Sequence, residues 1–223
     1  MSGIDDDDMS CGGVEELMDR TAWEAIWKAG PLVDQFTGLG NRHALNKQLE
    51  ELGSQERPVG TDVAVFLLDL DNFIYINDRY GHNIGDELLL IVARRLQNLA
   101  ESTGWAYRMG GDEFVLVLTG ISGRAGATML AERIVEAIRA PLTSGELREP
   151  SLALDGTLIT AAVGNAIMTR GSTPRDLLVR ADYAMFAAKQ TSGHGHPGRG
   201  YRALLFNDLP LEQRLRAQEL EAE

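Results

Sequence analysis

The sequence contains a single cysteine, Cys11, so no disulfide can form within its 223 residues. Such sparing use of cysteine is typical of proteins in reducing compartments. No apolar run reaches the roughly 20 residues that a membrane-spanning helix needs, and no signal peptide opens the chain. We therefore expect a cytoplasmic protein, with no membrane segment in this chain.

Basic residues are also scarce. The 21 Lys and Arg residues against 33 Asp and Glu residues give a net charge of -12. This balance disfavours non-specific binding to nucleic acid or to an anionic membrane. An acidic protein that handles polyphosphates needs local cations, which bound magnesium supplies. The four histidines show no spacing typical of a zinc site.

The length suits one domain with extensions at both ends. Residues 1–13 are acidic and predict a disordered tail. Residues 14–30 have helical periodicity, and two interpretations stay open. This helix either packs on the domain or couples it to a second protomer or an upstream sensor. The folded domain is expected over 31–206, and a further helix over 207–223.

Helical and strand patterns alternate along the chain without a Rossmann glycine fingerprint, and a hairpin lies in the middle of them. This order favours an α+β fold, with an antiparallel sheet flanked by helices. The patterns predict helices over 41–52, 72–79, 83–100 and 126–140, one that begins at Pro174, and one over 210–221. They predict strands over 63–70, 105–108, 113–118, 158–168 and 202–206.

The most informative segment is 108–114, RMGGDEF, which leads into an apolar run. Its two glycines permit a tight reversal and a close approach by a ligand. Asp112 and Glu113 are adjacent carboxylates at the start of a buried strand, and they repel each other unless a cation or a proton compensates. A second acidic segment, 69–71, ends the predicted strand 63–70. Two such segments can share a magnesium ion that also binds substrate phosphates.

These residues resemble the GGDEF domains, the diguanylate cyclases. Residues 110–114 spell GGDEF, and three more segments match the family in order. DQFTGLGNR at 34–42 resembles DxLTGLxNR, 69–87 resembles DxDxFKxINDxxGHxxGDE, and ADYAMFAAK at 181–189 resembles ADxALYxAK. The resemblance spans 34–206 and implies the ferredoxin-like fold of nucleotide cyclases, with 31–206 as the catalytic domain.

The resemblance also implies a reaction. Two GTP molecules condense into cyclic di-GMP and pyrophosphate in a homodimer whose protomers each hold one GTP, with Mg²⁺ or Mn²⁺ as cofactor. It implies Asp112 and Glu113 as catalytic residues, and it adds Asp69 and the Leu70 carbonyl to these two as metal ligands. Substrate binding is expected at Asn72, Phe73, Ile74, Asn77, Asp86, Gly110, Gly111 and Lys189.

Several of these residues have a plainer interpretation. Asp69 or Asn77 could cap a helix, and Lys189 could stabilise the C-terminal end of one. Arg108 could be structural or could contact a phosphate. For Asp86 the chemistry agrees with the resemblance, because a carboxylate accepts from guanine N1 and N2, and adenine lacks that donor pair.

The chain departs from the family pattern at two places. Ile74 replaces the usual lysine, and the segment 190–196 after Lys189 is longer by one residue and lacks the first arginine. These departures keep a second hypothesis open: a degenerate GGDEF domain that binds GTP and regulates a neighbouring domain without turnover.

Two further features concern regulation and partners. Many relatives carry an Arg-x-x-Asp product site upstream of the signature turn, where this chain has Glu101 and Gly104. We therefore expect no product inhibition through that surface. The helix at 207–223 resembles a linker to a downstream phosphodiesterase domain, so the chain is interpreted as a part of a longer protein.

Overall fold

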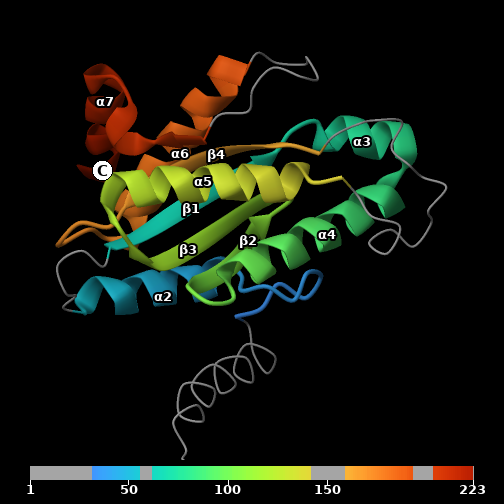
Figure 1. The fold of residues 1–223 in the computed structure, drawn as a ribbon, viewed down its shortest axis with the longest axis horizontal. Helices are drawn as coiled ribbons and strands as arrows, with labels where there is room; N and C mark the ends of the chain where they lie inside the picture. Colours follow the sequence, from blue (N-terminus) through green and yellow to red (C-terminus); the bar gives the residue numbers. More distant parts are fainter. Residues whose placement is uncertain (1–31, 56–61, 142–158, 193–202, 223) are drawn as a thin grey trace, which may run out of the picture.

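The computed structural model describes residues 32–55, 62–141, 159–192 and 203–222. One five-stranded sheet, in the order β2-β3-β1-β4-β5, forms its centre (Figure 1). The pairings β2–β3, β3–β1 and β1–β4 are antiparallel, and β5 alone joins in parallel. The predicted α+β fold is confirmed, with a sheet that is mixed at its β5 edge. The strands are β1 (Asp62–Leu70), β2 (Gly104–Gly110), β3 (Glu113–Ile121), β4 (Ala161–Ile167) and β5 (Ala203–Leu205).

Helices cover both faces of the sheet, which gives three layers (Figure 1). Helices α4 and α5 pack on one face, with α3 against α4, and α2 and α6 pack on the other, with α7 against α6. In the described residues no helix has the length and apolarity to cross a bilayer. The bounds are α2 (Arg42–Ser54), α3 (Phe73–Tyr80), α4 (His82–Ala100), α5 (Gly123–Arg139), α6 (Pro174–Ser192) and α7 (Leu211–Ala222), with a short 3-10 helix at Phe206–Asp208.

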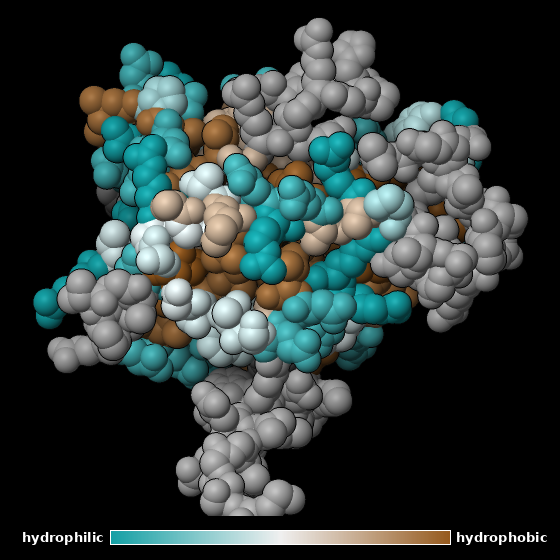
Figure 2. Space-filling view, in the orientation of Figure 1, coloured by the Kyte–Doolittle hydropathy of each residue, from teal (hydrophilic) through white to brown (hydrophobic). Residues whose placement is uncertain are grey.

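The central strand β1 explains why the sheet needs two helical layers. Phe66 and Leu68 enter the core under α4 and α5, whereas Val65 and Leu67 enter the core under α2 and α6. A strand buried on both faces reads as one continuous apolar run, which is the pattern of 63–68. Figure 2 shows the molecule from the side of α4 and α5, where apolar side chains lie in the seams between polar ones.

Gly164 of β4 brings α6 unusually close to the sheet. A Cβ at this position would overlap the backbone of Ala181 and Met185 in α6. Ala181, Ala184 and Ala188 of α6 are fully buried, so small side chains occur along the buried side of this helix. This close packing fixes α6 and therefore fixes the polar side chains that α6 carries toward the end of β1.

The predicted elements and the observed ones differ mainly at their ends. Phe206 does not extend the last strand, because β5 ends at Leu205 and Phe206 begins the 3-10 helix. The predictions of a tail over 1–13 and a helix over 14–30 lie outside the described residues. In the C-terminal helix, the side chains of Leu211 and Leu215 are exposed.

Candidate active site

The signature glycines make the tight turn between β2 and β3. Gly110 pairs with Glu113, so only Gly111 and Asp112 connect the two strands. Gly110 has φ 134° and Gly111 has φ 55°, conformations that side chains with a Cβ rarely adopt. The turn therefore holds Asp112 at the tip of the hairpin and Glu113 at the first position of β3.

The end of β1 lies beside this turn. Asp69 is directly opposite Glu113 in the antiparallel register of β1 and β3. The Leu70 N–H donates to the Asp112 carbonyl over 3.3 Å. The four residues predicted as metal ligands, Asp69, Leu70, Asp112 and Glu113, therefore meet at one end of the sheet.

Lys189 joins this group from the last turn of α6. Its Nζ lies 2.6 Å from Oδ1 of Asp69, and the side chains of Lys189 and Asp69 are 31% and 18% exposed. Asp69 is not a helix cap, because α3 begins after Asn72, which occupies the N-cap position. The ion pair with Lys189 was not predicted from the sequence, which gave Lys189 a role toward phosphates.

The clustering of carboxylates changes their acidity. Burial, and then the charge of Asp69, raise the pKa of Asp112, although Lys189 and Arg108 act in the opposite direction. Burial raises the pKa of Glu113 as well, with further contributions from nearby carboxylates including Asp69. The site thus holds more negative charge than its own cations neutralise, as expected of a place that receives an external cation.

Sequence reasoning gave no role to Asp182, although it lies in the segment 181–189 that resembles the family. Asp182 precedes Lys189 by two helical turns, so both lie on the same side of α6. Burial raises the pKa of Asp182, with Lys189 lowering it and Asp69 raising it. The seven-residue spacing from Lys189 was the signal that could have indicated this neighbour.

The carboxylates at this end of the sheet suit Mg²⁺ better than a metal that is coordinated by protein side chains alone. Among the described residues, no three His, Cys, Asp or Glu side chains form a metal-binding group. Mg²⁺ usually takes only one or two protein carboxylates and completes its shell with water and substrate phosphates. Asp69 and one of its neighbours, Asp112 or Glu113, would supply that number of carboxylates, and a bound nucleotide would supply the remaining oxygens.

Helix α3 begins immediately after β1 in an unusual conformation. Asn72 has φ 58° and is the one non-glycine residue with a left-handed backbone in the described part of the chain. Its side chain makes no capping hydrogen bond. The first N–H groups of a helix lack acceptors within the helix, so those of Phe73 and Ile74 are suited to phosphate oxygens. The Ile74 side chain itself is 75% exposed.

Asn77 and Asp86 are brought together where α3 packs on α4. Asn77 Oδ1 is buried and finds no hydrogen-bond partner among the described residues. A Cβ on Gly85 would overlap this oxygen, so the amide rests directly on the backbone that precedes Asp86. Asp86 is exposed beside it. The cap interpretation of the Asn77 side chain is wrong, because its Oδ1 accepts no hydrogen bond from the described residues; the bond that Gly81 donates goes to the Asn77 main-chain carbonyl.

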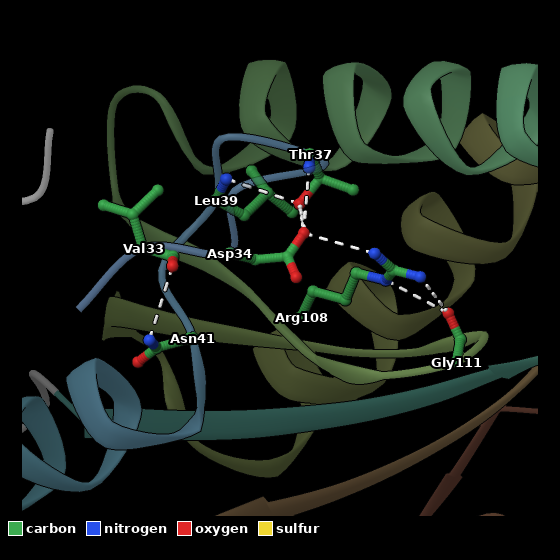
Figure 3. A network of polar contacts seen from close by, with 7 residues as sticks. All are labelled: Val33, Asp34, Thr37, Leu39, Asn41, Arg108 and Gly111. Atoms are coloured by element: carbon green, nitrogen blue, oxygen red, sulfur yellow. Dashed lines mark hydrogen bonds and ion pairs between the residues drawn. The ribbon is translucent and has the colours of Figure 1, made fainter. Parts of the chain in front are cut away.

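Arg108 braces the signature turn (Figure 3). Its Nε and Nη2 donate to the Gly111 carbonyl over 3.0 and 2.7 Å, and its Nη1 lies 3.2 Å from Asp34 Oδ1. The guanidinium also lies over the Phe36 ring. Of the two interpretations of Arg108, the structure supports the structural one.

Asp34 extends the brace into the loop before α2. It accepts hydrogen bonds from the Thr37 N–H and hydroxyl over 2.8 and 2.6 Å (Figure 3). Burial alone would raise the pKa of Asp34, but the bonds from Thr37 and Arg108 outweigh it and lower the pKa. The segment 34–42 that resembles the family thus supports the turn that carries Asp112.

The family profile described as "Diguanylate cyclase, GGDEF domain" matches residues 32–194. The chain therefore belongs to the GGDEF family of diguanylate cyclases. This match accounts for the fold, the signature turn and the four motif segments together.

Individual relatives agree with this assignment. The chain is 36% identical over 160 residues to the signaling protein YkoW of Bacillus subtilis, covering 70% of this chain and 19% of YkoW. It is 36% identical over 168 residues to the bifunctional diguanylate cyclase/cyclic di-GMP phosphodiesterase MucR of Pseudomonas aeruginosa, covering 74% and 23%. The matched part thus spans about a fifth of each relative.

Among solved structures, the fold is similar to the GGDEF domain of DgcB from Caulobacter crescentus in complex with c-di-GMP. The TM-score is 0.67 at 26% identity, over 80% of this chain and 98% of that one.

Proposed function

We propose that this GGDEF domain is a diguanylate cyclase that condenses two GTP molecules into cyclic di-GMP. The observation that carries the proposal is the meeting of Asp69, Asp112 and Glu113 with Lys189 at one end of the sheet. A second group, Asn77 and Asp86, lies on the helices that continue from this end. Together they offer sites for a metal, a triphosphate and a guanine.

The metal would be held by Asp69, the Leu70 carbonyl, Asp112 and Glu113. When bound, Mg²⁺ or Mn²⁺ would supply Lewis-acid stabilisation of the charge on the reacting phosphate. In this proposal Glu113 also helps to take the proton from the attacking hydroxyl.

The guanine would be read by Asn77 and Asp86. The carboxylate of Asp86 can accept from guanine N1 and N2, and the Asn77 amide can bond to the remaining edge. The buried Oδ1 of Asn77 without a described partner supports this assignment, since such atoms normally acquire one. Adenine would leave these groups unpaired, which disfavours ATP.

The triphosphate would lie at the start of α3 and the end of α6. The N–H groups of Phe73 and Ile74 face it from one side, with Gly110 and Gly111 allowing close approach, and the Lys189 ammonium reaches it from the other. Each 3′ oxygen then bonds to the α-phosphorus of the second GTP, the bond to pyrophosphate breaks, and the hydroxyl proton leaves to Glu113 or solvent. One domain holds one GTP, so a homodimer supplies the second.

The test is to incubate purified protein with GTP and Mg²⁺ and to identify the product by mass. Cyclic di-GMP and pyrophosphate in a 1:2 ratio are expected, because two GTP molecules join with loss of two pyrophosphates. Glu113→Gln serves as the inactive control, and Glu132→Gln, which changes an exposed carboxylate on α5, serves as the matched active one. GTP binding without any product in the unaltered protein would refute the proposal.

One observation favours the second candidate, a GTP-binding regulatory domain without turnover. Ile74 presents an exposed apolar side chain where the family usually places a lysine. If this loss decides the outcome, the protein binds GTP and forms no product, and Ile74→Lys restores product formation. Against this candidate, the chain keeps the carboxylates of the family pattern at Asp69, Asp112 and Glu113, which favours the cyclase.

The remaining expectations concern the whole protein. We place the domain in the cytoplasm, where GTP is available. We propose an upstream sensor or a downstream phosphodiesterase domain as its partner, since this chain spans about a fifth of YkoW and MucR. Helix α7, packed on α6, would then be the linker to the downstream domain.

A further inference from the structure

Lys189 and Asp69 form an ion pair inside the group of carboxylates. The Lys189 Nζ lies 2.6 Å from Asp69 Oδ1, and both side chains are mostly shielded from solvent. The same ammonium acts electrostatically on Asp112 and Asp182. In this state the ammonium of the protein neutralises Asp69, and the neighbouring carboxylates are compensated only in part.

This pairing conflicts with the expected use of Asp69 as a metal ligand. The ammonium occupies one carboxylate oxygen and repels a divalent cation that approaches the same group, and the repulsion is stronger in a partly buried site than in water. Moreover, the described residues offer no ready group of three ligands. Both observations predict that the empty domain binds a divalent metal poorly.

A nucleoside triphosphate would change this balance in two ways. Its oxygens would complete the shell of the metal, and they would give Lys189 a new anionic partner. The helix need not move for this exchange, because α6 is fixed on the sheet by the contact of Gly164 with Ala181 and Met185. The flexible lysine side chain alone can swing from Asp69 to a phosphate.

We propose that Lys189 is an internal counter-ion that couples metal binding to nucleotide binding. It neutralises Asp69 in the empty domain and releases this carboxylate when a nucleoside triphosphate arrives. The inference rests on the proposed function in taking GTP as the nucleotide and Asp69 as a metal ligand. By thermodynamic linkage, metal and nucleotide then raise each other's affinity by one common factor.

The experiment measures binding of Mn²⁺ by electron paramagnetic resonance, with and without a non-hydrolysable GTP analogue. Lys189→Met should bind Mn²⁺ alone about tenfold more tightly than the unaltered protein, a ratio that corresponds to about 1.4 kcal/mol. The factor by which the analogue raises Mn²⁺ affinity should be smaller in this variant. Lys189→Arg keeps the charge and should leave Mn²⁺ affinity without nucleotide low. Lys47→Met, an equal charge change on the exposed side of α2, should behave as the unaltered protein.

A lysine that only contacts phosphate would give a different result. Lys189→Met would then weaken the analogue and leave Mn²⁺ affinity without nucleotide unchanged, and this outcome overturns the proposal. Thermal unfolding is a second readout: without metal the variant should unfold at a lower temperature, and added Mn²⁺ should raise that temperature more than in the unaltered protein. If Lys189→Met does not fold, Lys189→Gln serves the same comparison.

The outcome is separable from the test of the proposed function. Binding is measured without turnover, so a domain that binds GTP and forms no product would still show the coupling. Conversely, product formation together with unchanged Mn²⁺ affinity in Lys189→Met would remove only the counter-ion role.

Discussion

Asn77 of α3 and Gly85 of α4 touch so closely that a Cβ on Gly85 would overlap Asn77 Oδ1. Glycine is unfavourable in a helix interior by about 1 kcal/mol relative to alanine. Gly85 nonetheless stands in the first turns of α4, next to Asp86. The contact connects a local feature of helix packing to the proposed guanine site.

Gly85→Ala should therefore impair nucleotide binding more than stability. The new methyl group would turn the Asn77 amide aside, and loss of a buried hydrogen bond should weaken GTP binding by about tenfold or more. The gain in helix propensity should offset much of the strain, so the free energy of unfolding should change little. Calorimetry with GTP and urea unfolding would measure both quantities.

The matched control is Gly53→Ala in α2. There the nearest heavy atom to a new Cβ is the Ser172 carbonyl oxygen at 3.5 Å, an ordinary contact. This variant should leave GTP affinity unchanged. Equal GTP affinity in Gly85→Ala and the unaltered protein would show that the contact with Asn77 does not matter for the nucleotide.

Asp86→Ser should reduce the preference for GTP over ATP. The carboxylate supplies two acceptors for guanine N1 and N2, and the shorter hydroxyl cannot replace them. We expect discrimination between GTP and ATP to fall by about tenfold or more, measured as the ratio of the two affinities. Asp78→Ser, at an exposed position of α3, is the control. An unchanged ratio in Asp86→Ser would mean that this residue does not read the base.

Asp112→Asn and Glu113→Gln should stabilise the metal-free protein at neutral pH. The pKa of each carboxyl is raised in the folded state, chiefly by burial and then by neighbouring carboxylates. The folded protein thus binds these protons more tightly than the unfolded chain, so its stability falls as pH rises through the raised pKa values. The amides carry no such charge and escape this loss.

The advantage of the amide variants should shrink as pH is lowered toward the ordinary values of 3.8 for Asp and 4.5 for Glu. Urea unfolding in chelator across this pH range measures the effect. Both variants should also lose product formation. Full activity in either, or a stability difference that does not depend on pH, would contradict the assignment of these carboxylates.

Arg108→Ala should loosen the signature turn. The guanidinium donates twice to the Gly111 carbonyl and pairs with Asp34, and hydrogen bonds to charged groups contribute about 1.5–3 kcal/mol. We expect a loss of that order in the free energy of unfolding and a lower kcat, because Asp112 lies in the turn. Arg108→Lys keeps the positive charge but lacks the several N–H donors of the guanidinium, so it should restore little of the stability or of kcat.

A double-mutant cycle of Arg108→Ala with Asp34→Asn would measure the pair itself. The pKa of Asp34 is lowered in the folded state, where hydrogen bonds from Thr37 and Arg108 outweigh burial. The ionised Asp34 should therefore stabilise the fold at pH values above the ordinary pKa of Asp, and this stabilisation should disappear as pH falls through the lowered pKa. The pH dependence is the reverse of that of Asp112. Coupling that is independent of pH would argue against the pair.

Much of the fold could be predicted because hydrophobic periodicity reports local structure directly. The helix expected over 83–100 is His82–Ala100, and the strand expected over 63–70 is Asp62–Leu70. The parallel pairing of β5 could not be derived in this way, because three residues with no alternating pattern carry no information on their partner. The close seating of α6 depends on Gly164, whose role appears only once the helix is placed.

The sequence indicated candidate site residues, and it did not indicate which of them contact one another. The segments 69–87 and 181–189 indicated Asp69 and Lys189 separately. Only the packing of α6 across β4 and β1 brings the two side chains together as an ion pair. Arg108 could not be assigned from the sequence, because its partners Asp34 and Gly111 come from different segments. Contacts between distant segments depend on topology, which local patterns do not encode.

Cyclic di-GMP should not inhibit this protein through the surface that carries the Arg-x-x-Asp site in many relatives. Glu101 follows the last residue of α4 and is exposed, and its negative charge would repel the phosphates of the product. Gly104 begins β2, and a Cβ there would overlap the Val117 carbonyl of β3. The chain therefore cannot place an aspartate at this position without moving the β2–β3 pairing.

The measurement is a titration of cyclic di-GMP into the cyclase assay at saturating GTP. Competitive inhibition at the GTP site should disappear as GTP is raised, because substrate and product share guanine. Inhibition that persists at saturating GTP and is abolished by Glu101→Ala would contradict the prediction.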